Sequence, residues 1–262
     1  MIALSINLNK IALIRNSREG NYPSVLDHAK ICLANGAQGI TVHPRPDQRH
    51  IRPDDVRELA DLVSSHPGIE FNVEGNPFAP AQDAYPGFLS LVMETHPHQC
   101  TLVPDSNDQL TSDHGFDLTV SGKKLAPIIT KLKENHMRVS LFMDPDKKQI
   151  ELARDLGADR IELYTGPYAA AWENEVQLMA LHETYAEAAT YARDIGLGVN
   201  AGHDLNLENL QKFRTIPGLM EVSIGHAFTA DSLTMGMAKA TEAYLNVLAG
   251  RDSGDGAKSP LE

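Results

Sequence analysis

The sequence predicts an α/β protein with a single domain, a (β/α)₈ TIM barrel over residues 1–249, followed by a polar tail at 250–262. Eight short runs rich in β-branched residues recur along the chain, and segments of helix length separate them. No Gly-x-Gly-x-x-Gly follows the first run, and Gly-x-x-x-x-Gly-Lys-Ser/Thr does not occur, so the usual nucleotide-binding signatures of an open sheet are missing. Strict alternation of strand and helix implies a parallel sheet, and eight repeats favour its closure into a barrel.

Each element has its own sequence signals. The predicted strands are 4–9, 39–44, 69–74, 99–104, 138–144, 160–166, 196–202 and 220–227. The segments 23–37 and 53–66 begin with Pro and carry apolar residues at helical spacing, and Gly36 closes the first of them, which is typical of helices. The segment 167–195 is longer than one crossover needs, which predicts an extra short helix after the sixth strand. The tail is rich in Gly and Ser and is expected to be mobile, without an assigned function.

Composition excludes several classes of protein. Apolar residues make up 42% and charged residues 22% of the chain, which suits a globular protein with a large core. No apolar run reaches the roughly 18 residues of a membrane helix, and the start MIALSINLNK lacks the features of a signal peptide, so we expect a cytoplasmic protein with no membrane partner. A net charge of −12 argues against nonspecific binding of nucleic acid. Cys32 and Cys100 form no Cys-x-x-Cys pair, so neither a disulfide framework nor a thiolate zinc site is expected.

The charge is distributed unevenly. Residues 1–52 carry seven basic and three acidic side chains, which leaves this segment at +4 and the remainder at −16. A small anion could bind at this basic segment, although solvated charges on helices and loops would give the same asymmetry.

Polar residues recur on one face of the predicted strands. Alternation along a strand sends successive side chains to opposite faces, one of which points into the barrel. The polar residues of this face are Ser5, Asn7, Asn9, Thr41, His43, Arg45, Glu70, Asn72, Glu74, Ser140, Asp144, Glu162, Tyr164, Asn200 and Ser223. A purely structural barrel would be filled with branched apolar side chains. A buried ion-pair network with nearby arginines could explain single carboxylates, but the whole set favours an active site at the carboxyl ends of the strands.

The segment ITVHPRPDQRHI, residues 40–51, predicts a phosphate pocket. His43 and Arg45 lie at the end of the second strand, and the loop that follows contains Arg49 and His50. Arg can bind phosphate through two parallel hydrogen bonds, and His can add a donor.

A second anion contact could come from the first loop and from backbone amides. Arg15 and Arg18 lie on the loop after the first strand, and Gly202 and Gly225 lie near predicted helix N-termini. A surface role for each arginine is the alternative.

The histidine pattern does not indicate a metal. The chain has 11 His, but it contains no His-Glu-x-x-His motif, and no close carboxylate pair accompanies the His positions. Ser223 lacks the Gly-x-Ser-x-Gly surroundings of a serine nucleophile. We therefore expect neither a catalytic metal nor a serine triad.

Seven segments, taken together and in order, resemble the pyridoxine 5′-phosphate synthase family. They are NLNKIALIRNSREG, ITVHPRPDQRHI, PHQCTLVPD, VSLFMDPD, IELYTG, VNAGHDL and SIGHAF, within residues 4–240. The resemblance implies a (β/α)₈ barrel that joins 1-deoxy-D-xylulose 5-phosphate to 3-amino-2-oxopropyl phosphate, giving pyridoxine 5′-phosphate, phosphate and water. It also implies that no organic cofactor is needed and that the protein is a homo-octamer built from dimers.

The resemblance assigns roles to residues of this chain. It implies that His43 and Glu70 act as general acid–base residues, His203 as a proton donor and Glu162 as a stabiliser of transition-state charge. Glu74 lies on the same strand face nearer the mouth, and Glu70 is preferred as the base. The residues implied to hold the deoxyxylulose phosphate are Arg45, His50 and Thr111, and those implied to hold the amino ketone phosphate are Asn7, Arg18, Asp204, Gly225 and His226.

Two features depart from the family pattern. Asn9 and Lys10 stand where many members carry Asp-His, so the Lys10 ammonium would replace an imidazole among the substrate contacts. The loop 75–87 is longer than in many relatives.

Two other functions are compatible with the pattern. A different phosphate-binding barrel, an aldolase or isomerase, would turn over one sugar phosphate alone. A noncatalytic sensor of phosphorylated metabolites would use Arg45 and His50 but would leave Glu70 and Glu162 without a role.

Overall fold

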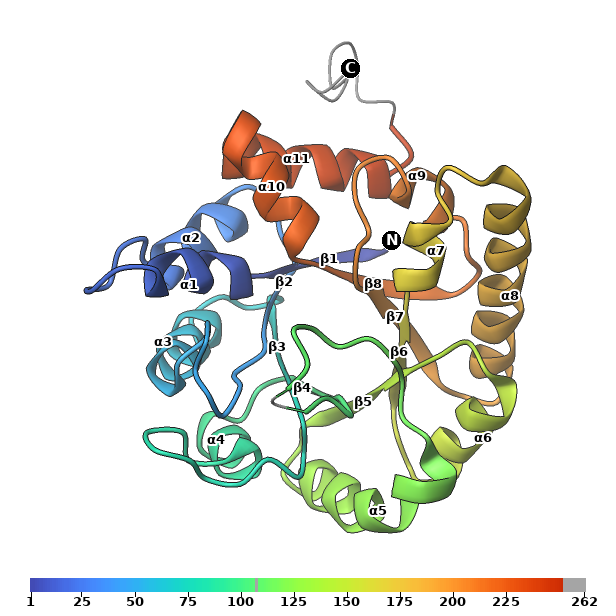
Figure 1. Cartoon of the computed structure of the whole chain (residues 1–262), viewed down its shortest axis with the longest axis horizontal. Helices are drawn as coiled ribbons and strands as arrows, with labels where there is room; N and C mark the ends of the chain where they lie inside the picture. Colours follow the sequence, from blue (N-terminus) through green and yellow to red (C-terminus); the bar gives the residue numbers. More distant parts are fainter. Residues whose placement is uncertain (107, 252–262) are drawn as a thin grey trace.

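The computed structural model describes residues 1–106 and 108–251, and it shows a closed barrel of eight parallel strands in sequential order, ringed by helices (Figure 1). The tail prediction for 252–262 lies outside the described residues. The strands are β1 Ala3–Asn7, β2 Gly39–Val42, β3 Glu70–Gly75, β4 Gln99–Leu102, β5 Arg138–Met143, β6 Arg160–Tyr164, β7 Gly198–Gly202 and β8 Leu219–Ile224. The barrel prediction and all eight strand positions are confirmed.

Helices connect successive strands on the outside of the barrel (Figure 1). They are α1 Asn9–Asn16, α2 Val25–Ala34, α3 Pro53–Ser64, α4 Phe88–Thr95, α5 Leu118–Glu134, α6 Lys147–Asp155, α7 Gly166–Ala170, α8 Glu175–Asp194, α9 Leu210–Phe213, α10 His226–Met235 and α11 Met237–Leu248. The short α7 before α8 confirms the extra helix after the sixth strand. Within the described ranges, no helix is long and apolar enough to cross a membrane.

The first strand is shorter than predicted. The Asn7 side-chain Oδ1 accepts a hydrogen bond from the backbone N–H of Asn9 at 3.0 Å, so the chain turns there and α1 begins at Asn9. Asn9 is therefore a helix residue at the barrel mouth rather than a strand residue.

The interior of the barrel is polar, as the strand pattern predicts, and hydrogen bonds join several of its side chains across neighbouring strands. Ser5 Oγ lies 2.7 Å from Thr41 Oγ1, and Asn72 Nδ2 donates to the same oxygen at 3.4 Å. Thr101 Oγ1 donates to Asn72 Oδ1 at 3.0 Å. The apolar core lies on the other strand face, where residues such as Leu4 and Ile6 are fully buried beneath the helices.

Arg15 forms a buried structural ion pair, which contradicts its prediction as an anion contact. Its side chain is 1% exposed, and the guanidinium binds both oxygens of Asp55 and donates to His50 O at 3.0 Å. Asp55 also accepts from the Arg52 N–H at 2.7 Å, which caps α3. The guanidinium of Arg15 is thus used to join α1 to α3 and the preceding loop.

Candidate active site

A cavity of about 400 Å³ lies at the carboxyl ends of the strands. All but two of the predicted site residues line it. They are Asn7, Asn9, Lys10, His43, Arg45, His50, Thr111, Glu162, His203, Asp204, Gly225 and His226. The side chains come from strand ends and loops that are far apart in the sequence, so closure of the barrel is what brings them together.

Glu70 does not belong to this cavity, and its predicted position there is wrong. It is the first residue of β3, and its carboxylate pairs with Arg138 at the amino end of the barrel, with Arg138 Nη1 to Glu70 Oε1 at 3.0 Å. Glu74 shares its strand face, lies about 13 Å further along the strand and lines the cavity. The structure therefore puts Glu74 where the sequence reasoning placed Glu70.

Arg18 also lies outside the cavity. It follows the C-terminal end of α1, its side chain is exposed, and its Nη1 donates to Ser17 O at 3.2 Å. In this arrangement the Arg18 side chain does not line the cavity in which its contact with an anion was predicted.

His43 lies between two carboxylates directly after β2. Its Nδ1 is 3.7 Å from Glu74 Oε2, and its Nε2 is 3.2 Å from Asp105 Oδ2. Burial alone would lower the pKa of His43, but the charge of Asp105 and then that of Glu74 outweigh it and raise the pKa to about 9. His43 is therefore an imidazolium at neutral pH and can donate a proton.

Two residues at and after the carboxyl end of β1 hold the His43–Glu74 pair in place. Asn7 Nδ2 donates to Glu74 Oε2 at 3.4 Å, and Asn9 Oδ1 accepts from the backbone N–H of His43 at 2.9 Å. Asn7 and Asn9 therefore hold Glu74 and His43 from the neighbouring strand and helix.

Glu162 is a buried carboxylic acid in the wall of the cavity. Burial, together with the negative charges of Glu74 and Glu221, raises the pKa of Glu162 well above its ordinary range. A Cβ at position 202 would lie 2.5 Å from Glu162 Oε1, so Gly202 is required for this side chain to fit. The buried carboxyl group is thus shifted toward its protonated form, in which it can donate a hydrogen bond.

His203 is held by its neighbours at the turn after β7. Asp204 Oδ2 lies 2.8 Å from Nδ1, and Thr111 Oγ1 lies 2.8 Å from Nε2. The bond to His203 lowers the pKa of Asp204, so Asp204 accepts and His203 Nδ1 donates. Both residues have left-handed backbone angles, with φ of 89° and 60°, and the Thr165 hydroxyl donates to Gly202 O at 2.7 Å beside this turn.

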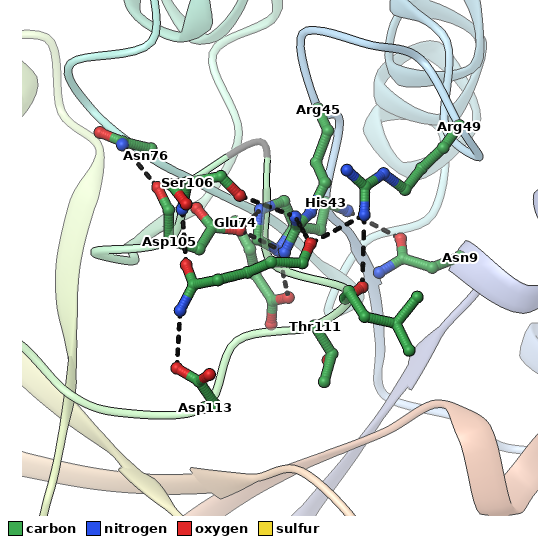
Figure 2. A network of polar contacts seen from close by, with 12 residues as sticks. Asn9, His43, Arg45, Arg49, Glu74, Asn76, Asp105, Ser106, Thr111 and Asp113 are labelled. Carbon is green, nitrogen blue, oxygen red and sulfur yellow. Dashed lines mark hydrogen bonds and ion pairs between the residues drawn. The ribbon is translucent and has the colours of Figure 1, made fainter.

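Basic groups gather on the β2 side of the mouth. Arg45 Nη1 donates to Gln109 O at 2.8 Å, and Arg49 Nη1 donates to the same oxygen at 2.8 Å (Figure 2). Burial, with the positive charges of His43, Arg45, Lys10 and Arg49 in support, lowers the pKa of His50 to about 3. His50 Nδ1 accepts from the Ile51 N–H at 2.9 Å, so the proton of this neutral imidazole is on Nε2 and can be donated to an anion.

Sequence reasoning missed Asp105, whose carboxylate contacts both His43 and Arg45. Its only sequence signal is the acidic residue that directly follows Pro104 after the fourth predicted strand. Arg49 belongs to the predicted phosphate pocket but was assigned no contact with a particular substrate, and it lines the cavity.

The fold and the cavity define a (β/α)₈ barrel enzyme, because acidic and imidazole side chains from several strand ends surround one cavity beside a basic cluster. A profile of the family described as "Pyridoxal phosphate biosynthesis protein PdxJ" matches residues 4–250. The chain belongs to this family, the pyridoxine 5′-phosphate synthases.

Curated relatives support the same assignment. The chain is 53% identical over 248 residues to "Pyridoxine 5'-phosphate synthase" of Xanthomonas campestris pv. campestris (strain B100), covering 94% of this chain and 96% of the relative. It is 51% identical to the protein of that name from Albidiferax ferrireducens, covering 94% and 97% of the two chains.

Solved structures at low identity show the same fold. The tryptophan synthase alpha chain from Legionella pneumophila superposes with a TM-score of 0.63 at 10% identity, covering 97% of this chain and 93% of that one. Thiamine phosphate pyrophosphorylase from Pyrococcus furiosus gives a TM-score of 0.56 at 14% identity, with 95% of each chain covered.

Proposed function

We propose that this chain joins 1-deoxy-D-xylulose 5-phosphate to 3-amino-2-oxopropyl phosphate, forming pyridoxine 5′-phosphate and releasing inorganic phosphate and water. The observation that carries the proposal is the meeting of acid–base side chains with a basic cluster around one cavity of about 400 Å³. Condensing an amine with a ketone, eliminating phosphate and closing a ring all require proton transfers, and both substrates carry phosphate.

The acid–base roles follow from protonation and geometry. Glu74 is the proposed base, because it lies in the cavity beside His43. His43 and Glu162 are the proposed proton donors in the interior. The pKa of His43 is raised to about 9, and that of Glu162 is raised well above its ordinary value. His203, oriented by Asp204, is the proposed donor on the opposite side of the mouth.

The two phosphates would occupy different parts of the mouth. Arg45, His50 and Thr111 are the proposed contacts of the deoxyxylulose phosphate, with Arg49 and Lys10 adding positive charge nearby. The N-terminus of α10, at Gly225 and His226, also lines the cavity and is the proposed contact of the amino ketone phosphate.

We further propose that the reaction uses no metal or organic cofactor, because proton transfers and close positioning of two bound substrates suffice for it. The resemblance also supports a cytoplasmic homo-octamer built from dimers, and light scattering of the purified protein would test the assembly.

Purified protein mixed with both substrates in the presence of EDTA is expected to form pyridoxine 5′-phosphate, detected by mass and absorbance. Reactions that omit either substrate serve as controls. Turnover of one sugar phosphate alone would favour the aldolase or isomerase alternative, and binding of both phosphates without any turnover would favour a sensor.

Replacing His50 with Leu is expected to raise the KM for 1-deoxy-D-xylulose 5-phosphate about 10- to 100-fold, because a hydrogen bond to a charged group contributes about 1.5–3 kcal/mol. kcat is expected to change little, since His50 is assigned to binding. His50→Gln keeps an N–H donor and is the matched control, with a smaller rise in KM. Steady-state kinetics with each substrate varied in turn measure both values, and an unchanged KM in His50→Leu would remove His50 from the phosphate site.

A further inference from the structure

Asp105 lies behind the active-site cavity rather than in its lining. Its carboxylate is 6% exposed, and Oδ2 lies 3.2 Å from His43 Nε2 and 2.5 Å from Arg45 Nη2 (Figure 2). These contacts are ion pairs without the alignment of a hydrogen bond. His43 and Arg45 line the cavity, whereas Asp105 faces the smaller cavity on their other side. Asp105 can therefore act on the reaction only through its two basic neighbours.

The backbone at Asp105 is anchored to β3. Asn76 Nδ2 donates to Asp105 O at 2.7 Å, and Asn76 Oδ1 accepts from the Phe78 N–H at 2.8 Å. Figure 2 shows Asn76 on the far side of Asp105 from His43. The backbone of Asp105 is thus held by the residue that directly follows β3, the strand that carries Glu74.

The charges around Asp105 depend on one another. Burial alone would raise the pKa of Asp105, but His43 and Arg45 outweigh it and lower the pKa. In return, Asp105 provides the largest charge contribution that keeps His43 protonated, ahead of Glu74. Arg45 is the positive group beside His43, since both contact Asp105 Oδ2. The ring of His50 lies 6.4 Å from that of His43, and because its own pKa is lowered to about 3 it carries no charge at neutral pH.

We propose that Asp105 is a positioning residue that fixes His43 Nε2 and Arg45 Nη2 together, so that His43 presents Nδ1 to Glu74 and Arg45 stays at the phosphate side of the cavity. This inference rests on the proposed function, in which His43 donates a proton and Arg45 binds phosphate. The same contact orients the loop after β4, because Arg45 Nη1 donates to Ser106 O at 3.2 Å and to Gln109 O at 2.8 Å.

The test compares Asp105→Asn with Asp105→Glu and with Asp113→Asn. Asp113 is a matched control, because it is an exposed carboxylate on the same loop that pairs with His114 and lies outside the proposed machinery. The first readout is the titration of His43 in protein labelled with ¹³C at histidine Cε1, assigned by the loss of its signal in His43→Gln. This readout does not require turnover, so it remains valid if the proposed reaction is not observed.

In Asp105→Asn the pKa of His43 is expected to fall by about 1 or more, because removing one close opposite charge has an effect of that size. Asp113→Asn is expected to leave it unchanged, and Asp105→Glu is expected to retain most of the elevation. An unchanged titration of His43 in a folded Asp105→Asn variant would overturn the proposal.

The second readout is the dependence of kcat on pH with both substrates present. Because protonated His43 is the donor, activity is lost as pH rises through its pKa, and in Asp105→Asn this loss is expected at lower pH. At the pH optimum kcat is expected to fall by up to about 10²-fold, because a displacement of about 1 Å in a residue that holds or protonates the substrate can have an effect of that size. A pH profile and a kcat in Asp105→Glu close to those of the unmodified protein would support the positioning role of Asp105. If Asp105→Asn does not fold, the test uses Asp105→Glu alone. A His43 titration and a pH profile in that variant like those of an isolated imidazole would count against the positioning role of Asp105.

Discussion

Replacing Glu74 with Gln is expected to lower kcat about 10²- to 10⁴-fold, the range typical of losing a general base or acid. The amide cannot accept a proton, yet it can still accept the hydrogen bond from Asn7 Nδ2, so both substrates should still bind. Single-turnover and steady-state assays with both substrates, together with binding measured for each substrate alone, separate the two effects.

Glu70→Gln is the matched control, because Glu70 lies on the same face of the same strand. We expect kcat in Glu70→Gln to stay within a few-fold of its value in the unmodified protein. The loss of its partly exposed pair with Arg138 should lower the free energy of unfolding by about 1 kcal/mol or less. A large loss of kcat in Glu70→Gln with full activity in Glu74→Gln would restore the original choice of base.

Replacing Arg15 with Met is expected to lower the free energy of unfolding by about 3–5 kcal/mol, the usual cost of leaving a buried charge without its partner. Asp55 stays buried in this variant, with side-chain exposure of 8%, and keeps only its hydrogen bond from the Arg52 N–H. Urea unfolding at a fixed protein concentration measures the change, since assembly would make stability depend on concentration.

Lys30→Met is the control for this stability measurement. Lys30 and Asp27 form an ion pair whose side chains are 53% and 67% exposed, so we expect a change of no more than about 0.5 kcal/mol. If Arg15→Met instead left stability intact and weakened phosphate binding, Arg15 would return to the role of an anion contact.

The fold could be predicted because the signals for it are local. Alternating apolar residues define each strand, and the count and spacing of the strands favour closure into a barrel. The boundary of β1 was misplaced because the Asn7 side chain accepts a hydrogen bond from the backbone N–H of Asn9 where the chain turns, which alternation along a strand does not reveal.

The site was predicted less completely than the fold. Alternation places Glu70 and Glu74 on one face, and their order along the strand puts Glu74 nearer the mouth, but neither signal shows how deep along the barrel axis the cavity reaches. That depth depends on the register between strands, in which Glu70 lies opposite Gly39 at the start of β2. Asp55 lies 40 positions from Arg15 in the sequence, so the ion pair that removes Arg15 from the anion sites could not be inferred locally.

The hydrogen-bonded interior links the active site to residues that contact no substrate. The series runs from Ser5 through Thr41, Asn72 and Thr101, and Thr101 Oγ1 lies 3.5 Å from Glu162 Oε2. An aliphatic replacement at Thr41 or Asn72 would leave a neighbouring hydroxyl or amide buried without its partner. Evolution can therefore accept few substitutions at these positions, because each side chain must keep its hydrogen-bond partners in the barrel interior. This constraint holds even though the positions lie below the active-site cavity.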